Sequence, residues 1–155
     1  MADDLEKRLE KAEKHVSKGK IEPAIEEYKA ALKLAPQRLE LLHTLGDLCQ
    51  RVDRAGEALA YYGELFDKYA DRGDTTKALS VFRKSLHGTE QPPERNFKLG
   101  NLLQRSQKNE EAAEAFRHAL DGFRRLGNSQ GAVECLDRIG GLEPDHAETQ
   151  IQLGE

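Results

Sequence analysis

Apolar residues recur every three or four positions along almost the whole chain, and polar or charged residues fill the positions between them. Segments 39–52, 55–71 and 75–87 all show this spacing. The apolar face of the first consists of Leu42, Leu45, Cys49 and Val52. Because an α-helix turns once every 3.6 residues, the pattern predicts amphipathic helices and no strands. We therefore expect an all-α fold.

The helical pattern repeats with a period of 54 residues. A shift of 54 places Leu45-Gly46 on Leu99-Gly100 and on Leu153-Gly154. An alanine is followed four residues later by a large apolar or aromatic residue at five places: Ala24/Tyr28, Ala58/Tyr62, Ala78/Phe82, Ala112/Phe116 and Ala132/Leu136. A single unit of this kind leaves its apolar stripe uncovered, so neighbouring units must stack to form a continuous core.

Each unit is predicted to contain three helices separated by turn residues. Gly73 is expected to end the helix 55–71 because glycine tolerates a positive φ, and the side chains of 74–76 offer N-caps for the next helix. Pro92-Pro93 ends one unit and starts the next. Gly140-Gly141 is interpreted as a further helix stop.

We therefore predict one helical-repeat domain over residues 1–155, with about nine helices. A first helix pair (1–38, with helices near 3–18 and 21–34) precedes two full units (39–92 and 93–146). The start of a further helix (147–155) follows. Because this last piece is only half a helix, we expect the chain to be a fragment of a longer repeat protein.

These residues resemble the tetratricopeptide repeat family. A Leu-Gly pair leads to an alanine with an aromatic four residues later, as in Leu99-Gly100 followed by Ala112 and Phe116. The closing prolines are Pro36 and Pro144. The chain departs from the family pattern in two ways. The aromatic that opens the first helix is replaced by Leu42 and Asn96, and the 20-residue spacing favours a three-helix unit over simple 34-residue pairing. The resemblance implies a right-handed superhelical α-α solenoid of antiparallel helices.

Charge and composition exclude several classes of partner. The net charge is -4 and the mean hydropathy is -0.75, so nothing favours nucleic acid or an anionic membrane surface. There is no apolar stretch of about 18 residues and no apolar segment typical of a signal peptide near the start. Cys49 and Cys135 fall at apolar helix positions, which indicates reduced thiols in a cytoplasmic protein.

Catalytic and cofactor motifs are absent from the sequence. The five histidines form no HExxH and no metal-ligand spacing with cysteine, and no glycine pattern of a phosphate-binding loop occurs. We assign His15 to core packing, His87 to a helix end and His146 to a solvated loop. We therefore expect no enzyme, no metal and no cofactor.

The resemblance implies that the first helix of each unit lines a concave groove that binds a peptide or helix of a partner protein. This predicted partner-binding face has fifteen residues. They are Glu40, His43, Thr44, Asp47, Arg51, Glu64, Asp67, Glu94, Phe97, Lys98, Asn101, Arg105, Arg117, His118 and Asp121. Phe97 is interpreted either as a binding anchor or as a packing residue against the preceding helix.

Two further hypotheses concern what the groove binds. The carboxylate clamp of chaperone-binding relatives is not built here. Its matching positions hold Glu13, Thr44 and Glu114, and only Lys98 and Asn101 are of a suitable type. The N-terminal part of the face is acidic, so we expect a ligand with one basic end. The alternative function is structural, in which the open C-terminal edge builds a homo-oligomer.

Overall fold

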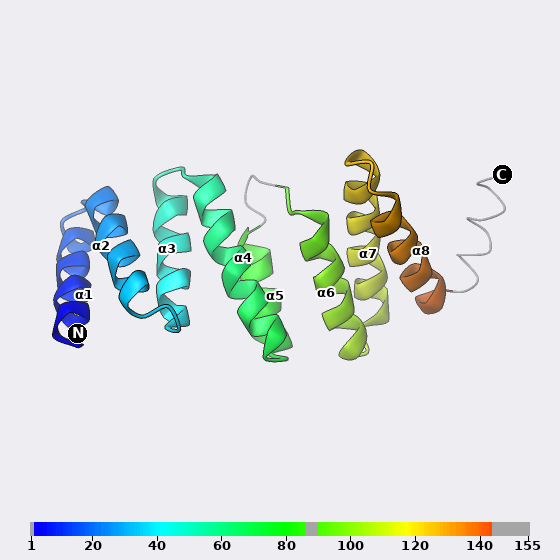
Figure 1. The fold of residues 1–155 in the computed structure, drawn as a ribbon, viewed down its shortest axis with the longest axis horizontal. Helices are drawn as coiled ribbons and strands as arrows, with labels where there is room; N and C mark the ends of the chain where they lie inside the picture. Colours follow the sequence, from blue (N-terminus) through cyan, green and yellow to red (C-terminus); the bar gives the residue numbers. More distant parts are fainter. Residues whose placement is uncertain (1, 86–89, 144–155) are drawn as a thin grey trace. The chain divides into compact units, whose positions relative to one another are not determined.

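The computed structural model describes residues 2–85 and 90–143, and all secondary structure in these two ranges is α-helical. The helices are α1 (Ala2–Ser17), α2 (Ile21–Leu34), α3 (Leu39–Arg51), α4 (Ala55–Asp71), α5 (Thr75–Ser85), α6 (Pro93–Arg105), α7 (Asn109–Arg125) and α8 (Ser129–Leu142) (Figure 1). The predicted all-α fold is confirmed. The ninth expected helix, together with His87, Pro144 and His146, lies outside the described residues.

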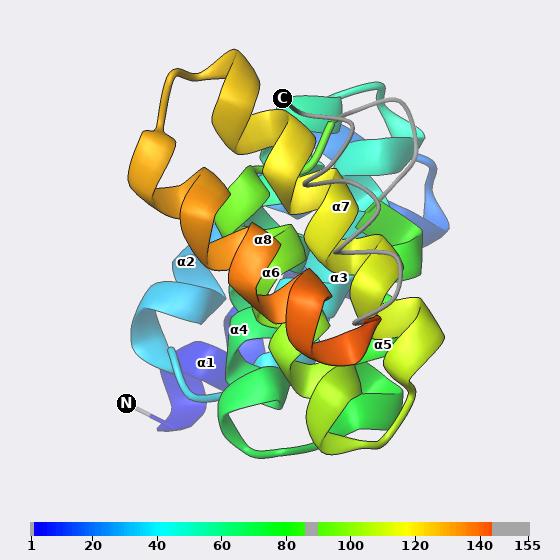
Figure 2. The same ribbon diagram turned by 90° about the vertical axis from the view of Figure 1, so that its right-hand side faces the viewer.

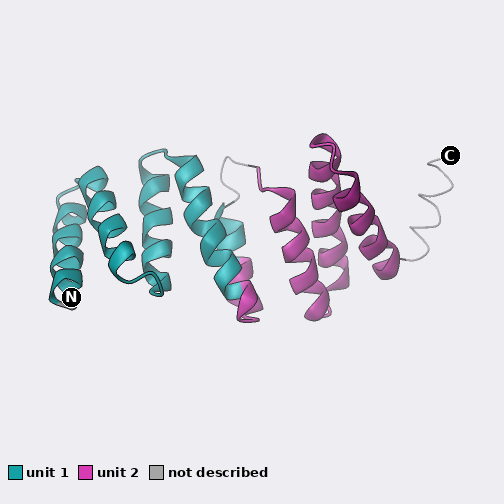
Figure 3. Ribbon diagram, in the orientation of Figure 1, with its two compact units in different colours: residues 1–69, 80–89 teal, residues 70–79, 90–155 magenta. Residues whose placement is uncertain are grey.

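The helices group into two compact units (Figure 3). Unit 1 contains residues 1–69 and 80–89, and unit 2 contains residues 70–79 and 90–155. In unit 1, α2 packs against both α1 and α3. In unit 2, α7 packs against both α6 and α8 (Figures 1 and 2). Three-residue turns at 18–20, 52–54, 106–108 and 126–128 make consecutive helices antiparallel.

Helix boundaries recur at intervals of 54 residues. Helices α3 and α6 begin at Leu39 and Pro93, and α4 and α7 begin at Ala55 and Asn109. The turns recur as well, since Gly19, Gly73 and Gly127 have φ values of 74°, 73° and 72°. An L-residue side chain is strained at such a φ, which explains why all three turns use glycine. The non-glycine turns at Asp53 (φ 58°) and Gln107 (φ 62°) form a second matching pair.

A glycine lies close to an aromatic ring at matching positions in the core of each unit. In unit 1, a Cβ added to Gly46 on α3 would lie 2.5 Å from the ring of Tyr62 on α4. In unit 2, a Cβ added to Gly100 on α6 would lie 2.6 Å from the ring of Phe116 on α7. Both rings are fully buried. The Leu-Gly pair of each unit therefore places a bare backbone against a buried aromatic side chain.

Helix starts follow the predicted signals. Pro93 occupies the first turn of α6. The side chain of Asp74 accepts a hydrogen bond from the backbone N–H of Lys77 at 3.2 Å, and that of Asn128 accepts one from Gly131 at 2.9 Å. Each satisfies one of the free donors at a helix N-terminus, so these two residues cap α5 and α8.

One expectation at α8 is wrong. Gly140-Gly141 does not stop a helix, because α8 continues to Leu142 and neither glycine takes a positive φ. Leu136, which completes the fifth alanine pair, is 39% exposed, whereas its counterparts Tyr28 and Phe82 are buried. Tyr28 and Phe82 belong to internal helices, and Phe82 packs on Phe66 with 5.6 Å between ring centroids. No described helix follows α8 to cover Leu136.

Candidate partner-binding face

None of the fifteen residues of the predicted partner-binding face is buried. The exposed ones are Glu40, Arg51, Glu64, Glu94, Arg105, His118 and Asp121. The half-buried ones are His43, Thr44, Asp47, Asp67, Phe97, Lys98, Asn101 and Arg117. The structure brings some of them together in two clusters, one in each unit, at positions related by the 54-residue shift.

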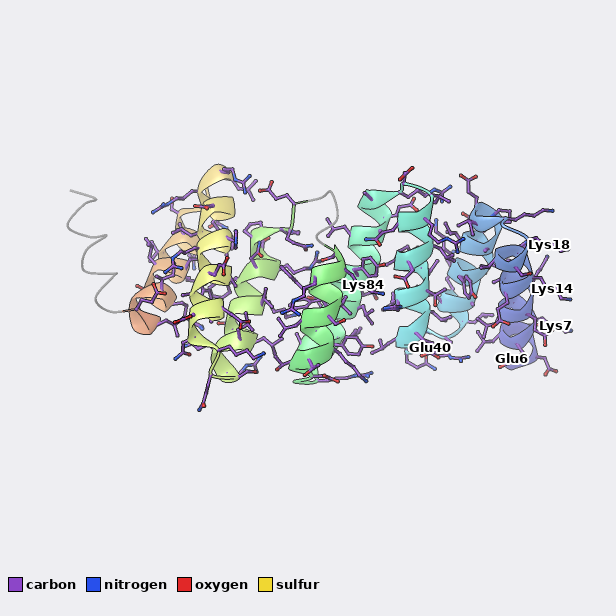
Figure 4. The ribbon with its side chains drawn as sticks, turned by 180° about the vertical axis from the view of Figure 1, so that it is seen from behind. Glu6, Lys7, Lys14, Lys18, Glu40 and Lys84 are labelled. Atoms are coloured by element: carbon purple, nitrogen blue, oxygen red, sulfur yellow. The ribbon has the colours of Figure 1, made fainter. Side chains whose placement is uncertain are left out.

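The first cluster lies in unit 1 between α3, α4 and α5, and its centre is the Asp47 carboxylate. Lys84 Nζ lies 3.3 Å from Asp47 Oδ1 and 2.9 Å from His43 Nε2. His43 Nδ1 lies 3.3 Å from Asp47 Oδ2, and the Tyr62 hydroxyl donates to Asp47 Oδ1. We call the residues His43, Asp47, Gln50, Tyr62 and Lys84 the Asp47 cluster. Figure 4 labels Lys84 on α5.

Gln50 completes the Asp47 cluster by joining α3 to α4 and to α5. Its Nε2 donates to the backbone oxygen of Lys84 at 3.0 Å, and its Oε1 accepts from the Tyr62 hydroxyl at 3.4 Å. Burial, and then the hydrogen bond to Asp47, raise the pKa of Tyr62 well above its usual value. The carboxylate of Asp47 is thus already occupied by a cation and a hydroxyl of its own chain.

Replacing Tyr62 with phenylalanine should therefore lower the free energy of unfolding by about 1 kcal/mol, because a hydroxyl that donates to a half-buried carboxylate is lost. Urea unfolding followed by circular dichroism measures the change. Tyr61→Phe is the matched control, since the structure gives the Tyr61 hydroxyl no hydrogen bond within the described residues. Equal losses in the two variants would contradict the role of the Asp47 cluster.

The second cluster lies in unit 2, where the counterparts of the Asp47 cluster are Phe97, Asn101, Gln104, Phe116 and Arg138. Arg138 Nη1 donates to Asn101 Oδ1. The Arg138 guanidinium carbon lies 5.4 Å from the centroid of the Phe97 ring and 5.9 Å from that of Phe116. The two rings meet edge to face with 5.3 Å between centroids. Phe97 thus packs on the following helix α7, and its ring orients Arg138.

A surface pocket opens beside this second cluster. It is lined by Asn101, Gln104, Arg105 and Arg138, and we call it the Arg138 pocket. Gln104 Oε1 is buried and has no hydrogen-bond partner in residues 2–85 and 90–143. Its counterpart Gln50 accepts from the Tyr62 hydroxyl, whereas Phe116 has no hydroxyl to offer. The exchange of tyrosine for phenylalanine explains the unpaired acceptor.

Other residues of the predicted partner-binding face pair locally. Lys98 Nζ lies 3.4 Å from Asp71 Oδ1, and Arg117 pairs with Glu143 at the end of α8. Glu40, which Figure 4 labels at the start of α3, accepts from Arg38 Nε at 2.9 Å. These exposed or half-exposed pairs contribute little to stability. The fifteen residues therefore do not form one continuous cluster.

Sequence reasoning missed Gln104, Lys84 and Arg138. The resemblance directs attention to the first helix of each unit, whereas Lys84 and Arg138 belong to the third helices α5 and α8. A usable signal was present, because the 54-residue shift places Lys84 on Arg138 and Gln50 on Gln104. The first of these positions holds a cation in both units, and the second holds an amide in both units.

Groups that could support chemistry are sparse in the described residues. These residues contain no group of three or more histidine, cysteine, aspartate or glutamate side chains that could hold a metal ion. Cys49 and Cys135 are buried free thiols, and burial raises the pKa of each to about 11. Such thiols are protonated at neutral pH and are poor nucleophiles. No described helix is both long and apolar enough to cross a membrane.

Comparison with known families identifies the repeat. A family profile described as Tetratricopeptide repeat matches residues 9–38 and residues 93–121. The chain contains tetratricopeptide repeats. The matches fall on α1–α2 and on α6–α7, so the repeat protein has one recognised helix pair in each unit. No curated protein sequence matches the chain.

Several solved structures are similar to this tetratricopeptide repeat protein. MamA has 16% identity and a TM-score of 0.40, and the match covers 96% of both chains. YrrB, described as a TPR protein with an unusual peptide-binding site, has 20% identity and a TM-score of 0.34 over 94% of this chain and 90% of its own. A putative kinesin light chain from Podospora anserina with nearly identical TPR-like repeats has 17% identity and a TM-score of 0.43, covering 96% and 88%.

Proposed function

We propose that this tetratricopeptide repeat protein is an interaction scaffold that binds a peptide or helix of a partner protein along the predicted partner-binding face. The observation that carries the proposal is the Arg138 pocket. The residues that line this pocket include Arg138, whose guanidinium lies over the Phe97 ring, and Gln104, whose Oε1 is unpaired in the described residues. Aromatic and arginine side chains beside a pocket are the residue types that dominate binding energy at interfaces.

The residues around this pocket favour a binding role over a catalytic one. The neighbouring charged groups are arginines, and the described residues near it include no nucleophile paired with a base, as acyl transfer would require. The buried reduced thiols support our proposal that the protein works in the cytoplasm.

The sequence predicts a ligand with one basic end at the N-terminal part of the face. Asp47 is not a suitable residue for testing this prediction. Reversing the charge of Asp47 would place a cation beside Lys84, so a lost interaction with a partner would not be separable from damage to the Asp47 cluster. Glu64 is exposed on α4 and has no partner in the described residues, which makes it the better position for charge reversal.

Affinity capture from the native lysate tests the proposal. The variant carries Arg51→Glu and Arg105→Glu, two exposed residues of the face that lie 54 positions apart. The matched control carries Lys14→Glu and Lys18→Glu on the α1 side (Figure 4), which changes the net charge equally and alters none of the fifteen residues. We expect the first variant to capture about tenfold less partner, the effect of losing one strong contact, and the control to match wild type. Equal capture by all three proteins would contradict the proposal.

Self-association through α8 is the second candidate function. Val133 is 55% exposed and Leu136 is 39% exposed on this helix, whereas their counterparts on α2, Ile25 and Tyr28, are buried. A second copy of the chain that covered these two side chains would bury apolar surface, which favours association.

A further inference from the structure

We propose that the Arg138 pocket binds the carboxylate of an internal aspartate or glutamate in the partner's peptide, together with the backbone N–H of that same residue. The inference rests on the proposed function and adds the chemistry of one contact residue. It differs from recognition of a chain-terminal carboxylate in the position of the acidic group, which is a side chain within the peptide and not the end of the chain.

The pocket carries two positive charges, from Arg105 and Arg138. Arg138 and Arg105 have no carboxylate within 4.0 Å in the part of the chain that the structure describes. The only side-chain acceptor that Arg138 reaches there is Asn101, which is neutral. In unit 1 the same position holds Asp47, whose carboxylate lies 3.3 Å from Lys84 Nζ. Unit 1 thus supplies its own anion, and unit 2 leaves that role to a ligand.

Contacts with two neighbouring side chains orient Arg138. Its guanidinium lies over the Phe97 ring and donates to Asn101, so two contacts restrict the orientation of a long flexible side chain. A guanidinium held in this way presents its remaining N–H groups as a planar fork, which matches the two oxygens of a carboxylate. The ordering cost of binding is reduced because the side chain is already oriented.

Gln104 supplies an unpaired acceptor. Its Oε1 is buried and accepts from no group of the described residues, and the Gln104 side chain lines the pocket together with the two arginines. A carboxylate alone would leave this oxygen unpaired, which costs free energy. The backbone N–H of an internal acidic residue satisfies it from the same ligand residue. The pocket therefore fits an acidic residue within a peptide better than a simple anion.

The test uses the full chain labelled with ¹⁵N and the small probe N-acetyl-glutamate N′-methylamide, which carries one side-chain carboxylate between two peptide groups. Two matched probes are the glutamine analogue, which lacks the charge, and sodium acetate, which lacks the peptide N–H. Binding is followed through the side-chain signals of Arg138 Nε–H and the Gln104 amide. We expect the glutamate probe to bind about tenfold more tightly than either matched probe.

Three variants separate the pocket from general charge effects. Asn101→Asp gives unit 2 the carboxylate that unit 1 already has, and it should weaken binding of the glutamate probe by about tenfold. Arg138→Gln should also weaken binding of the glutamate probe by about tenfold, without adding a negative charge. Because Arg138 is exposed, this variant should keep the fold. Lys84→Gln, the matched change in the Asp47 cluster, should leave the affinity unchanged, because Lys84 is already paired with Asp47.

Unchanged affinity in both Asn101→Asp and Arg138→Gln would overturn the proposal. Equal binding of acetate and the glutamate probe would overturn the role of Gln104. Because the probe is a single residue, these outcomes do not depend on any partner protein. A further outcome is that the pocket variants bind the glutamate probe as tightly as wild type while the variant with Arg51→Glu and Arg105→Glu no longer captures the partner. That combination would overturn this inference and leave the proposed function intact.

Discussion

Replacing Phe116 with alanine should lower the free energy of unfolding by about 3 to 5 kcal/mol, the range observed when a buried aromatic ring is removed. Phe116 is fully buried, and its ring contacts the backbone of α6 at Gly100. The Phe97 ring packs on it edge to face, and Arg138 lies 5.9 Å from its centroid. The truncation would therefore leave a cavity at the centre of unit 2 and remove the support of the Arg138 pocket.

Urea unfolding followed by circular dichroism measures this loss. Leu126→Ala is the matched control, because Leu126 is 70% exposed and its truncation should change the free energy of unfolding by less than about 0.5 kcal/mol. A loss below about 1 kcal/mol for Phe116→Ala would contradict the packing described for α6 and α7.

Replacing Gly46 with alanine should lower the free energy of unfolding by about 1 to 3 kcal/mol, the range for inserting a methyl group into a packed core. The new Cβ would lie 2.5 Å from the Tyr62 ring, a distance that real Cβ atoms do not show. The Tyr62 ring is fully buried and its hydroxyl is held by Asp47, so it cannot move away freely. This steric cost outweighs the gain of up to about 1 kcal/mol in helix propensity.

Gly56→Ala supplies the control for propensity alone. Gly56 lies in α4, and a Cβ added there meets nothing within 4 Å. We expect this change to be neutral or to stabilise the protein by up to about 1 kcal/mol. If Gly46→Ala behaved like Gly56→Ala in thermal or urea unfolding, the close approach of α3 and α4 would be contradicted.

The fold could be predicted from the sequence to within a few residues. The apolar spacing predicted α4 over 55–71 and α2 over 21–34, and the structure has the same bounds. Glycine at a turn and proline at a helix start act through local backbone sterics, which are visible in the sequence. Gly140-Gly141 was misread because a glycine pair ends a helix only when the chain also turns there, and that depends on residues further along.

The Arg138 pocket could not be predicted in the same way. Its formation depends on a third-helix arginine reaching Asn101 on α6, which is a contact between residues 37 positions apart. The unpaired state of Gln104 depends on Phe116 lacking the hydroxyl that Tyr62 directs at Gln50. The 54-residue shift identifies each of these pairs of positions, but only the structure shows that their side chains meet.

Site-specific photo-crosslinking tests the central claim most directly. A benzoylphenylalanine is placed at Thr44 or at Arg105 on the predicted partner-binding face, and at Lys14 or at Leu136 as comparisons outside it. The account predicts adducts with one partner protein from Thr44 and Arg105, and none with that partner from Lys14 or Leu136. The account would be contradicted if the partner formed adducts only with the variants at Lys14 or Leu136. If Leu136 alone gave adducts, and these joined two copies of the chain, self-association through α8 would be favoured.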